Sequence, residues 1–391
     1  MNRQIIKIGL AIIFIFLLVP VSAQNPDNTE AYLITCSPGT ESYSMYGHSA
    51  IRLHDTVTGL DAVYNWGVFD FSTPNFTYKF ARGRLDYMLG VYSYKSFLQE
   101  YLFENRSVFS QKINLSHDQL VKLLSLLDEN MKKENRFYRY DFFMDNCATR
   151  IRDILENVVG SDLVYPPEQS DETVTYRMRI DEYQKGKFSW LDVGIDFLLG
   201  SPADNPCGFR ESMFLPDYLK SNLSKAEIKT EEGSIPLLGR RDVLLDFSDN
   251  VQAKLPFYRQ PWFILSLVSL LLIFMTFRLN NVKIQNGFDI LFYSIMFILS
   301  FLMIFTNYLT DHAAMHNNFN MVWLNPLLLV TPVIALLKYP HPWFWRSLIY
   351  LSIVFMILMV FIRQTLNPAF IPVILLLIAR SWYRLSLSTS H

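Results

Sequence analysis

The sequence predicts an α+β domain outside the membrane, followed by an α-helical bundle within it. In residues 24–254, short β-like runs precede segments with helical periodicity. After Pro261 the chain becomes a succession of apolar segments. Of the 391 residues, 51% are hydrophobic and only 18% are charged, whereas about 25% are charged in ordinary soluble chains. This composition excludes disordered, collagen-like and coiled-coil proteins.

The first 23 residues have the layout of a secretory signal peptide. Arg3 and Lys7 precede an apolar stretch, and the segment ends in the small-residue site Val21-Ser22-Ala23. A retained N-terminal anchor is the alternative. In both cases, the residues after Ala23 are expected to leave the cytoplasm.

Residues 24–190 are predicted to form the α+β domain. Strands are expected at three β-rich runs: Ala31–Cys36, Ser49–Leu53 and Ala62–Val68. Two helices are expected from their periodicity and end signals: Asp118–Asn130 behind the cap Ser116, and Asn146–Val159 before Gly160. Residues 191–260 are expected to be a loop-rich extension and linker.

Residues 261–391 are predicted to form a membrane domain with about five transmembrane helices. The apolar segments are 262–277, 288–306, 324–337, 347–362 and 366–379. Because several are short and contain proline, four helices with one re-entrant segment are the alternative. Basic residues gather at the ends that the exported N-terminal domain places in the cytoplasm: Arg278, Lys283, Lys338, Arg346, Arg380 and Arg384.

Charge and cysteine content restrict the partners and cross-links. The formal net charge is −1, so no nucleic acid partner is expected. Three cysteines are too few to stabilise a chain of this length by a disulfide framework. A Cys36–Cys207 disulfide is allowed in an exported domain, and two buried thiols are the alternative.

Two short motifs in the exported part carry candidate chemistry. His48 opens a predicted strand, and Cys147 lies at the start of a predicted helix. The positive end of the helix dipole and the unpaired amides there favour a thiolate. A facing histidine would then act as general acid and base. The competing interpretation is a buried inert thiol and a satisfied core histidine.

The order of the motifs, histidine on a strand and then cysteine at a helix start, resembles the circularly permuted branch of the papain-like superfamily, which includes permuted NlpC/P60 hydrolases. Three longer stretches are more specific: LITCSPGT (33–40), YSMYGHSAIR (43–52) and YRYDFFMDNCATRIRD (138–153). Together with the helical tail, they resemble the DUF4105 family, in particular the Lnb proteins. The resemblance implies a periplasmic, permuted papain-like (NlpC/P60-like) thiol domain, anchored in the inner membrane, with lipoprotein N-acyltransferase activity.

A third catalytic residue is expected to orient the imidazole of His48. Asn65, on the following strand, is the first candidate, and Asp70 is the second. A turn-ordering role is the alternative for Asn65.

Substrate contacts are predicted close to the nucleophile and in one loop of the membrane part. Near Cys147 they are Asn146, Tyr46 and Arg139, of which Arg139 is expected to meet a phosphate. Core packing is the alternative for the aromatic residues of this region.

The polar loop 307–323 has no lysine or arginine and is predicted to lie on the outer face. His312, His316 and Asn318 are expected to hold a headgroup or carbonyl beneath the thiol domain. The i, i+4 spacing of the two histidines suits a metal, but no third strong ligand is evident. We therefore expect no metal and no cofactor. A solvated loop whose asparagines cap helices is the alternative.

The predicted function is cysteine-dependent acyl transfer. An acyl chain moves from a phospholipid donor to Cys147 as a thioester and then to an amine. The resemblance alone specifies the acceptor, the N-terminal amine of a diacylglyceryl-cysteine lipoprotein. The alternatives are a membrane-tethered NlpC/P60-like peptidoglycan peptidase or amidase, and a non-enzymatic membrane scaffold.

Overall fold

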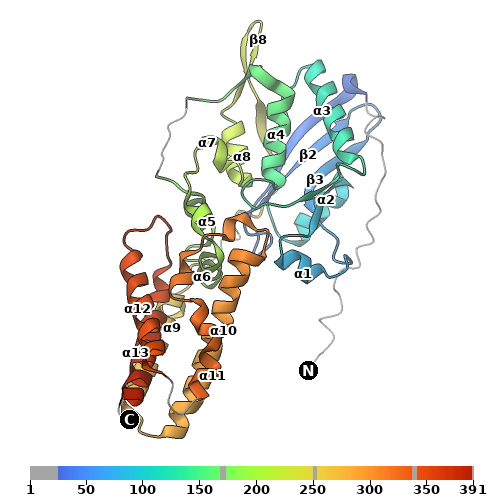
Figure 1. The fold of residues 1–391 in the computed structure, drawn as a ribbon. Helices are drawn as coiled ribbons and strands as arrows, with labels where there is room; N and C mark the ends of the chain where they lie inside the picture. Colours follow the sequence, from blue (N-terminus) through green and yellow to red (C-terminus); the bar gives the residue numbers. More distant parts are fainter. Residues whose placement is uncertain (1–24, 168–172, 250–252, 337–340, 390–391) are drawn as a thin grey trace.

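The computed structural model describes residues 25–167, 173–249, 253–336 and 341–389. Figure 1 shows a sheet-bearing N-terminal domain above an elongated helical bundle, with α5 and α6 between them. The predicted signal peptide, residues 1–23, lies outside the described residues.

The N-terminal domain is built on one seven-stranded antiparallel sheet in the order β10-β5-β1-β2-β3-β4-β6. Its strands are β1 (Thr29–Cys36), β2 (His48–Asp55), β3 (Asp61–Val68), β4 (Asp86–Ser93), β5 (Val108–Ile113), β6 (Phe137–Arg139) and β10 (Leu238–Leu245). A second, three-stranded sheet contains β7 (Leu163–Val164), β8 (Glu227–Thr230) and β9 (Gly233–Pro236). The three strands expected from the sequence are confirmed as β1, β2 and β3.

Helices cover both faces of the large sheet. One face is covered by α3 (His117–Met131), α4 (Cys147–Val159) and α8 (Pro216–Leu223), and the other by α2 (Tyr94–Phe103). Leu123 of α3 and Leu155 of α4 are fully buried against Ile51 and Tyr64. Each fully buried leucine contributes about 1.5–3 kcal/mol relative to an exposed one, so α4 is anchored along its length.

Both predicted helices of this domain are confirmed. Ser116 caps α3 in a reciprocal capping box with Gln119. Asn146 caps α4, and Gly160, with φ of +67°, ends it. The helix therefore starts at Cys147, one residue after the expected start at Asn146, which is its cap.

The described residues of 191–260 contain regular elements where a loop-rich extension is expected. These elements are most of α6 (Ser189–Leu198), α7 (Phe209–Ser212), α8 and β8 to β10, and α5 (Tyr176–Gln184) precedes them. The helices are short, and β10 is a sheet-edge strand that carries Arg240, Arg241 and Asp242. Charged edge strands lack the apolar alternation by which strands are recognised in a sequence.

A buried ion-pair network joins this region to the bundle. Arg177 of α5 is 1% exposed and binds both Asp196 (2.8 Å) and Asp204 (2.9 Å). Asp196 also accepts a hydrogen bond from Asn367 Nδ2 (2.9 Å), and Asp204 accepts one from the backbone N–H of Thr365 (3.0 Å). The two carboxylates therefore connect α5 and α6 to the segment before the last helix.

The membrane part contains three helices that are long and apolar enough to span a bilayer, counted over the described residues. These spans are Pro261–Arg278 (α9), Val282–Leu309 (α10, Val282–Ile304, and a π-helical turn) and Pro368–Ser388, which contains most of α13 (Ile371–Thr389). The helix α12 (Pro342–Leu358) is apolar but shorter. The expected span 324–337 is represented, as far as it is described, by a 3₁₀ turn (Pro326–Val330) and α11 (Thr331–Leu336). The count of five helices stays a prediction.

The last helix corrects one expectation about charge. Arg380 and Arg384 are expected beyond the final span, yet α13 includes both of them. Arg380 is fully buried, and its guanidinium binds Asp289 (3.0 Å) and Gln285 (2.6 Å) of α10. The partner carboxylate makes this buried position possible. Lys338, a further basic residue of the prediction, lies outside the described residues.

The end of α10 meets the N-terminal domain. The backbone N–H of Asp311 donates to the carbonyl of Arg82 (2.8 Å), and Gly200 N–H donates to the carbonyl of Ala314 (2.9 Å). Because residues 310–318 follow the span Val282–Leu309 directly, this end of the bundle faces the sheet domain.

Candidate active site

Cys147 is the first residue of α4, and its position is fixed by the cap that precedes it. Oδ1 of Asn146 accepts hydrogen bonds from the backbone N–H groups of Ala148 (2.8 Å) and Thr149 (3.0 Å). In return, Oγ1 of Thr149 accepts from the backbone N–H of Asn146 (2.8 Å). The sulfur therefore lies at the positive end of the helix dipole.

The side chain of Asn146 is fully used inside the protein. Its Nδ2 donates to the carbonyls of Phe142 (2.7 Å) and Phe214 (2.9 Å), while Oδ1 caps the helix. An amide side chain offers two donor hydrogens and two acceptor positions. No polar group of Asn146 is left for the predicted substrate contact, and its geometry is that of a residue that positions Cys147.

Replacing this cap tests its role. We expect Asn146→Ala to lower the free energy of unfolding by about 1–3 kcal/mol, because a cap is lost and two carbonyls lose their partner. Alkylation of Cys147 by iodoacetamide should also slow at least threefold. Ser116→Ala, which removes the cap of α3, is the matched control: its stability loss should come without a change in alkylation. Equal alkylation in both variants would contradict the positioning role.

His48 opens β2 behind a tightly constrained glycine. Gly47 has φ of +81°, and a Cβ at this position would lie 2.8 Å from the carbonyl oxygen of Cys36. Only glycine fits both the left-handed backbone and the close approach. Gly47 is not among the candidate residues that the sequence suggests, although its position directly before His48 is a usable signal.

The imidazole of His48 lies between Cys147 and Asn65. Nε2 of His48 is 2.5 Å from Oδ1 of Asn65. Because an amide oxygen only accepts, Nε2 carries a proton, which leaves Nδ1 for the sulfur. The alternative orienting residue, Asp70, is exposed and accepts hydrogen bonds from Ser72 in a turn. The structure thus brings together Cys147, His48 and Asn65, and leaves Asp70 outside the group.

The surroundings of the sulfur favour a thiolate. Burial is the largest effect and would raise the pKa of the Cys147 thiol, but the charge and hydrogen bond of His48 oppose it. The nearby backbone N–H groups of Ser49 and Ala148 also stabilise the charged sulfur, so the net pKa of Cys147 lies below the ordinary 9.0. For His48, burial lowers the pKa, and the thiolate together with Asn65 raises it to a net value above 6.5. Both shifts favour the thiolate–imidazolium pair.

The other two cysteines have inert surroundings. Cys36 and Cys207 are buried and free, so the optional disulfide between them is not formed. Burial raises the pKa of both thiols, that of Cys207 to about 12. Of the three cysteines, only Cys147 combines partial exposure with a lowered pKa.

Comparison with known proteins places this geometry in a family. Residues 22–181 match the family model of the Lnb N-terminal periplasmic domain, and residues 254–391 match that of the Lnb transmembrane domain. The chain carries both domains of the Lnb family. Neither the curated proteins nor the solved structures contained a match. The sheet domain of this Lnb-family protein is therefore periplasmic, and the helical bundle lies in the membrane.

Two of the predicted substrate contacts of this Lnb-family protein have different surroundings. The ring of Tyr46 packs against Phe142 (centroids 4.9 Å apart), and its hydroxyl binds the side chain of Gln184. It is thus part of a packed cluster. Arg139 is more than half exposed and pairs with Asp86 (3.3 Å). The substrate roles of both residues stay predictions.

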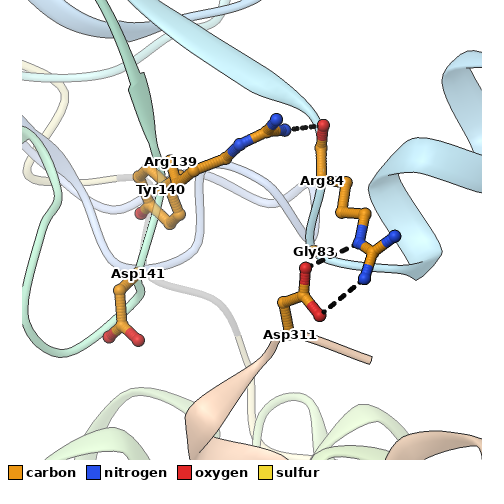
Figure 2. Close-up of a pocket in the computed structure, with 6 residues that line it drawn as sticks. All are labelled: Gly83, Arg84, Arg139, Tyr140, Asp141 and Asp311. Atoms are coloured by element: carbon orange, nitrogen blue, oxygen red, sulfur yellow. Dashed lines mark hydrogen bonds and ion pairs between the residues drawn. The ribbon is translucent and has the colours of Figure 1, made fainter. Parts of the chain in front are cut away.

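A polar pocket of about 430 Å³ lies where the periplasmic domain meets the outer loop of the bundle. It is lined by Gly83, Arg84, Arg139, Tyr140, Asp141 and Asp311. Figure 2 shows the guanidinium of Arg84 facing both carboxylate oxygens of Asp311, at 2.7 and 3.3 Å. Arg84 and Asp311 are 227 positions apart, so the sequence offers no signal for this pair.

The predicted loop residues hold the loop in place. Nε2 of His312 contacts the carbonyl of Phe80 (3.0 Å), and Nε2 of His316 contacts the carbonyl of Thr310 (2.9 Å). Nδ2 of Asn318 donates to the carbonyl of Phe197 (2.8 Å). Each of these side chains is directed at a backbone carbonyl. Their headgroup-binding role stays a prediction.

Proposed function

We propose that the protein is a thiol acyltransferase that moves an acyl chain from a phospholipid to the N-terminal amine of diacylglyceryl-cysteine lipoproteins at the inner membrane. The supporting observation is the grouping of Cys147, His48 and Asn65 in a periplasmic domain held against a membrane bundle. The chain order, histidine strand before cysteine helix, agrees with a permuted papain-like domain. The acceptor rests on the resemblance to Lnb proteins.

The first half-reaction forms a thioester. The thiolate of Cys147 attacks the ester carbonyl carbon, an S–C bond forms, and the C–O bond to the lysophospholipid breaks. The proton on His48 passes to the departing alkoxide. The backbone N–H of Cys147, at the helix start, is placed to stabilise the oxyanion, and one such donor contributes roughly 10²–10³-fold in rate.

The second half-reaction forms an amide. The acceptor amine attacks the thioester carbonyl, the N–C bond forms and the S–C bond breaks. Neutral His48 takes the amine proton, which restores the imidazolium and the thiolate. Oδ1 of Asn65 keeps Nε2 of the imidazole protonated throughout, so that Nδ1 carries the transferred proton.

Intact mass of the purified protein after mixing with phospholipid vesicles tests this proposal. We expect one acyl mass to be added, mapped to the peptide containing Cys147. A synthetic diacylglyceryl-cysteine peptide should then remove it and gain an amide. A protein that gains no acyl mass but cleaves muropeptides would be the tethered peptidase and would overturn the proposal.

The ion pair also predicts a pH dependence. Alkylation of Cys147 by iodoacetamide should rise with pH through a midpoint below 9.0, because His48 and the backbone amides lower its pKa. In His48→Ala, burial continues to raise the pKa while the imidazolium is lost, so the midpoint should move upward. His54→Ala, on the same strand, is the control with an unchanged midpoint. An unmoved midpoint in His48→Ala would contradict the pair.

A further inference from the structure

A series of contacting aromatic rings leads from the surface of the periplasmic domain towards the candidate nucleophile. Phe71 contacts Phe76 (centroids 5.0 Å apart) and Phe69 (4.9 Å). Phe69 contacts Tyr87 (5.3 Å), and Tyr87 contacts Tyr140 (4.6 Å). Each step is within the distance of an ordinary aromatic contact.

The inner end of this series borders the sulfur. Tyr140 and Cys147 pack against the same core cluster beneath α4. Burial raises the pKa of the Tyr140 hydroxyl, and the charge on Cys147 is the next contribution. Asp141, which follows Tyr140, and Asp145, two positions before Cys147, exchange backbone hydrogen bonds (3.0 Å each), so the chain brings the last ring of the series and Cys147 to the same part of the core.

The outer end of the series is exposed to an unusual degree. Phe71 is 76% exposed, and Tyr78 and Phe80 of α1 (Phe76–Ala81) are 58% and 52% exposed. These residues belong to one segment, 69–80, which we call the aromatic segment. Adjacent exposed aromatic side chains on a folded domain mark a contact surface.

The aromatic segment lies at the level where the bundle leaves the membrane. The carbonyl of Phe80 contacts Nε2 of His312 (3.0 Å), and the carbonyl of Arg82 accepts from the backbone N–H of Asp311 (2.8 Å). Residues 311 and 312 are the second and third residues after the span Val282–Leu309. Figure 1 shows α1 at the lower edge of the sheet domain, on the side of the bundle.

We propose that the aromatic segment inserts into the outer surface of the bilayer and that the ring series conducts a phospholipid acyl chain to Cys147. Aromatic side chains favour the headgroup layer, where their rings contact acyl chains. The bilayer is the expected contact of the aromatic segment, because the carbonyl of Phe80 contacts His312, a residue of the loop that emerges from the membrane. Insertion is independent of the chemistry at Cys147, whereas conduction rests on the proposed acyl transfer.

Insertion is tested by depth-dependent quenching in lipid nanodiscs. In a Cys147→Ser background, Cys36 and Cys207 are buried, so Phe71→Cys or Phe80→Cys introduces one accessible thiol for a bimane label. Phospholipids with a nitroxide on the acyl chain should quench these labels at least threefold more than a label at Val57→Cys. Val57 is 72% exposed and lies beyond the end of β2 opposite His48. Equal quenching at the three positions would overturn insertion.

Conduction is tested by the rate of adduct formation on Cys147. The Phe71→Asp, Phe80→Asp double variant should lower the rate with vesicle phospholipid at least tenfold. In the double variant, the rate at which iodoacetamide alkylates Cys147 should change less than twofold. Val57→Asp should change neither the rate of adduct formation nor the rate of alkylation. Equal loss of both rates, or no loss with phospholipid, would overturn conduction. If the unaltered protein forms no adduct, acyl transfer and conduction both fail, while the quenching result still decides insertion.

Discussion

Cys147→Ser is expected to abolish acyl-adduct formation, with a rate loss of at least about 10³-fold, because a serine hydroxyl is not ionised by the neighbouring imidazolium as a thiol is. Serine is close in size to cysteine, and position 147 is only partly buried, so the variant should fold and insert normally. Intact mass after exposure to phospholipid measures the adduct. In cells that lack the native gene, the variant should leave lipoprotein N-termini without the amide-linked acyl chain.

Cys207→Ser is the matched control for this loss. Cys207 is free and buried, and it packs in a cluster with Phe214 and Leu215. The substitution should lower stability slightly and leave the rate of adduct formation unchanged. Retention of more than a tenth of the adduct in Cys147→Ser would mean that another group carries the acyl chain, and the proposed mechanism would be wrong.

The parts of the site that the sequence predicts are those set by local rules. Asn146 and Thr149 form a helix cap within four residues, so the start of α4 and the place of Cys147 are readable from the chain. β2 and β3 are neighbours in both sequence and sheet, so the sequence predicts that Asn65 lies beside His48.

The parts that the sequence does not predict depend on contacts between distant segments. Asp289 of α10 and Arg380 of α13 are 91 positions apart in the sequence, and their pairing places a basic residue inside the bundle. Ser49 supplies a backbone N–H to the sulfur, and a backbone donor has no side-chain signature. The edge strand β10 is recognisable only once β5 is beside it.

Gly200 lies at a contact of this distant kind, between the periplasmic domain and the outer loop of the bundle. A Cβ at Gly200 would lie 1.8 Å from the carbonyl oxygen of His316 and 3.1 Å from that of Met315. Both carbonyl oxygens belong to the backbone, so the added methyl group of Gly200→Ala must displace the loop. The displacement breaks the hydrogen bond from Gly200 N–H to the carbonyl of Ala314. We expect a stability loss of about 1–3 kcal/mol and at least tenfold slower adduct formation with vesicle phospholipid.

The reactivity of Cys147 itself separates this effect from general damage. Because Gly200 lies at the contact with the loop and has no part in the thiolate–imidazolium pair, iodoacetamide should alkylate Cys147 in Gly200→Ala within twofold of the native rate. Gly194→Ala is the matched control: its Cβ meets no atom within 4 Å, and alanine in a helix gains up to about 1 kcal/mol over glycine. A native rate with vesicle phospholipid in Gly200→Ala would show that delivery of the donor does not depend on this contact. Loss of alkylation to the same extent as adduct formation would instead place the damage in the active site.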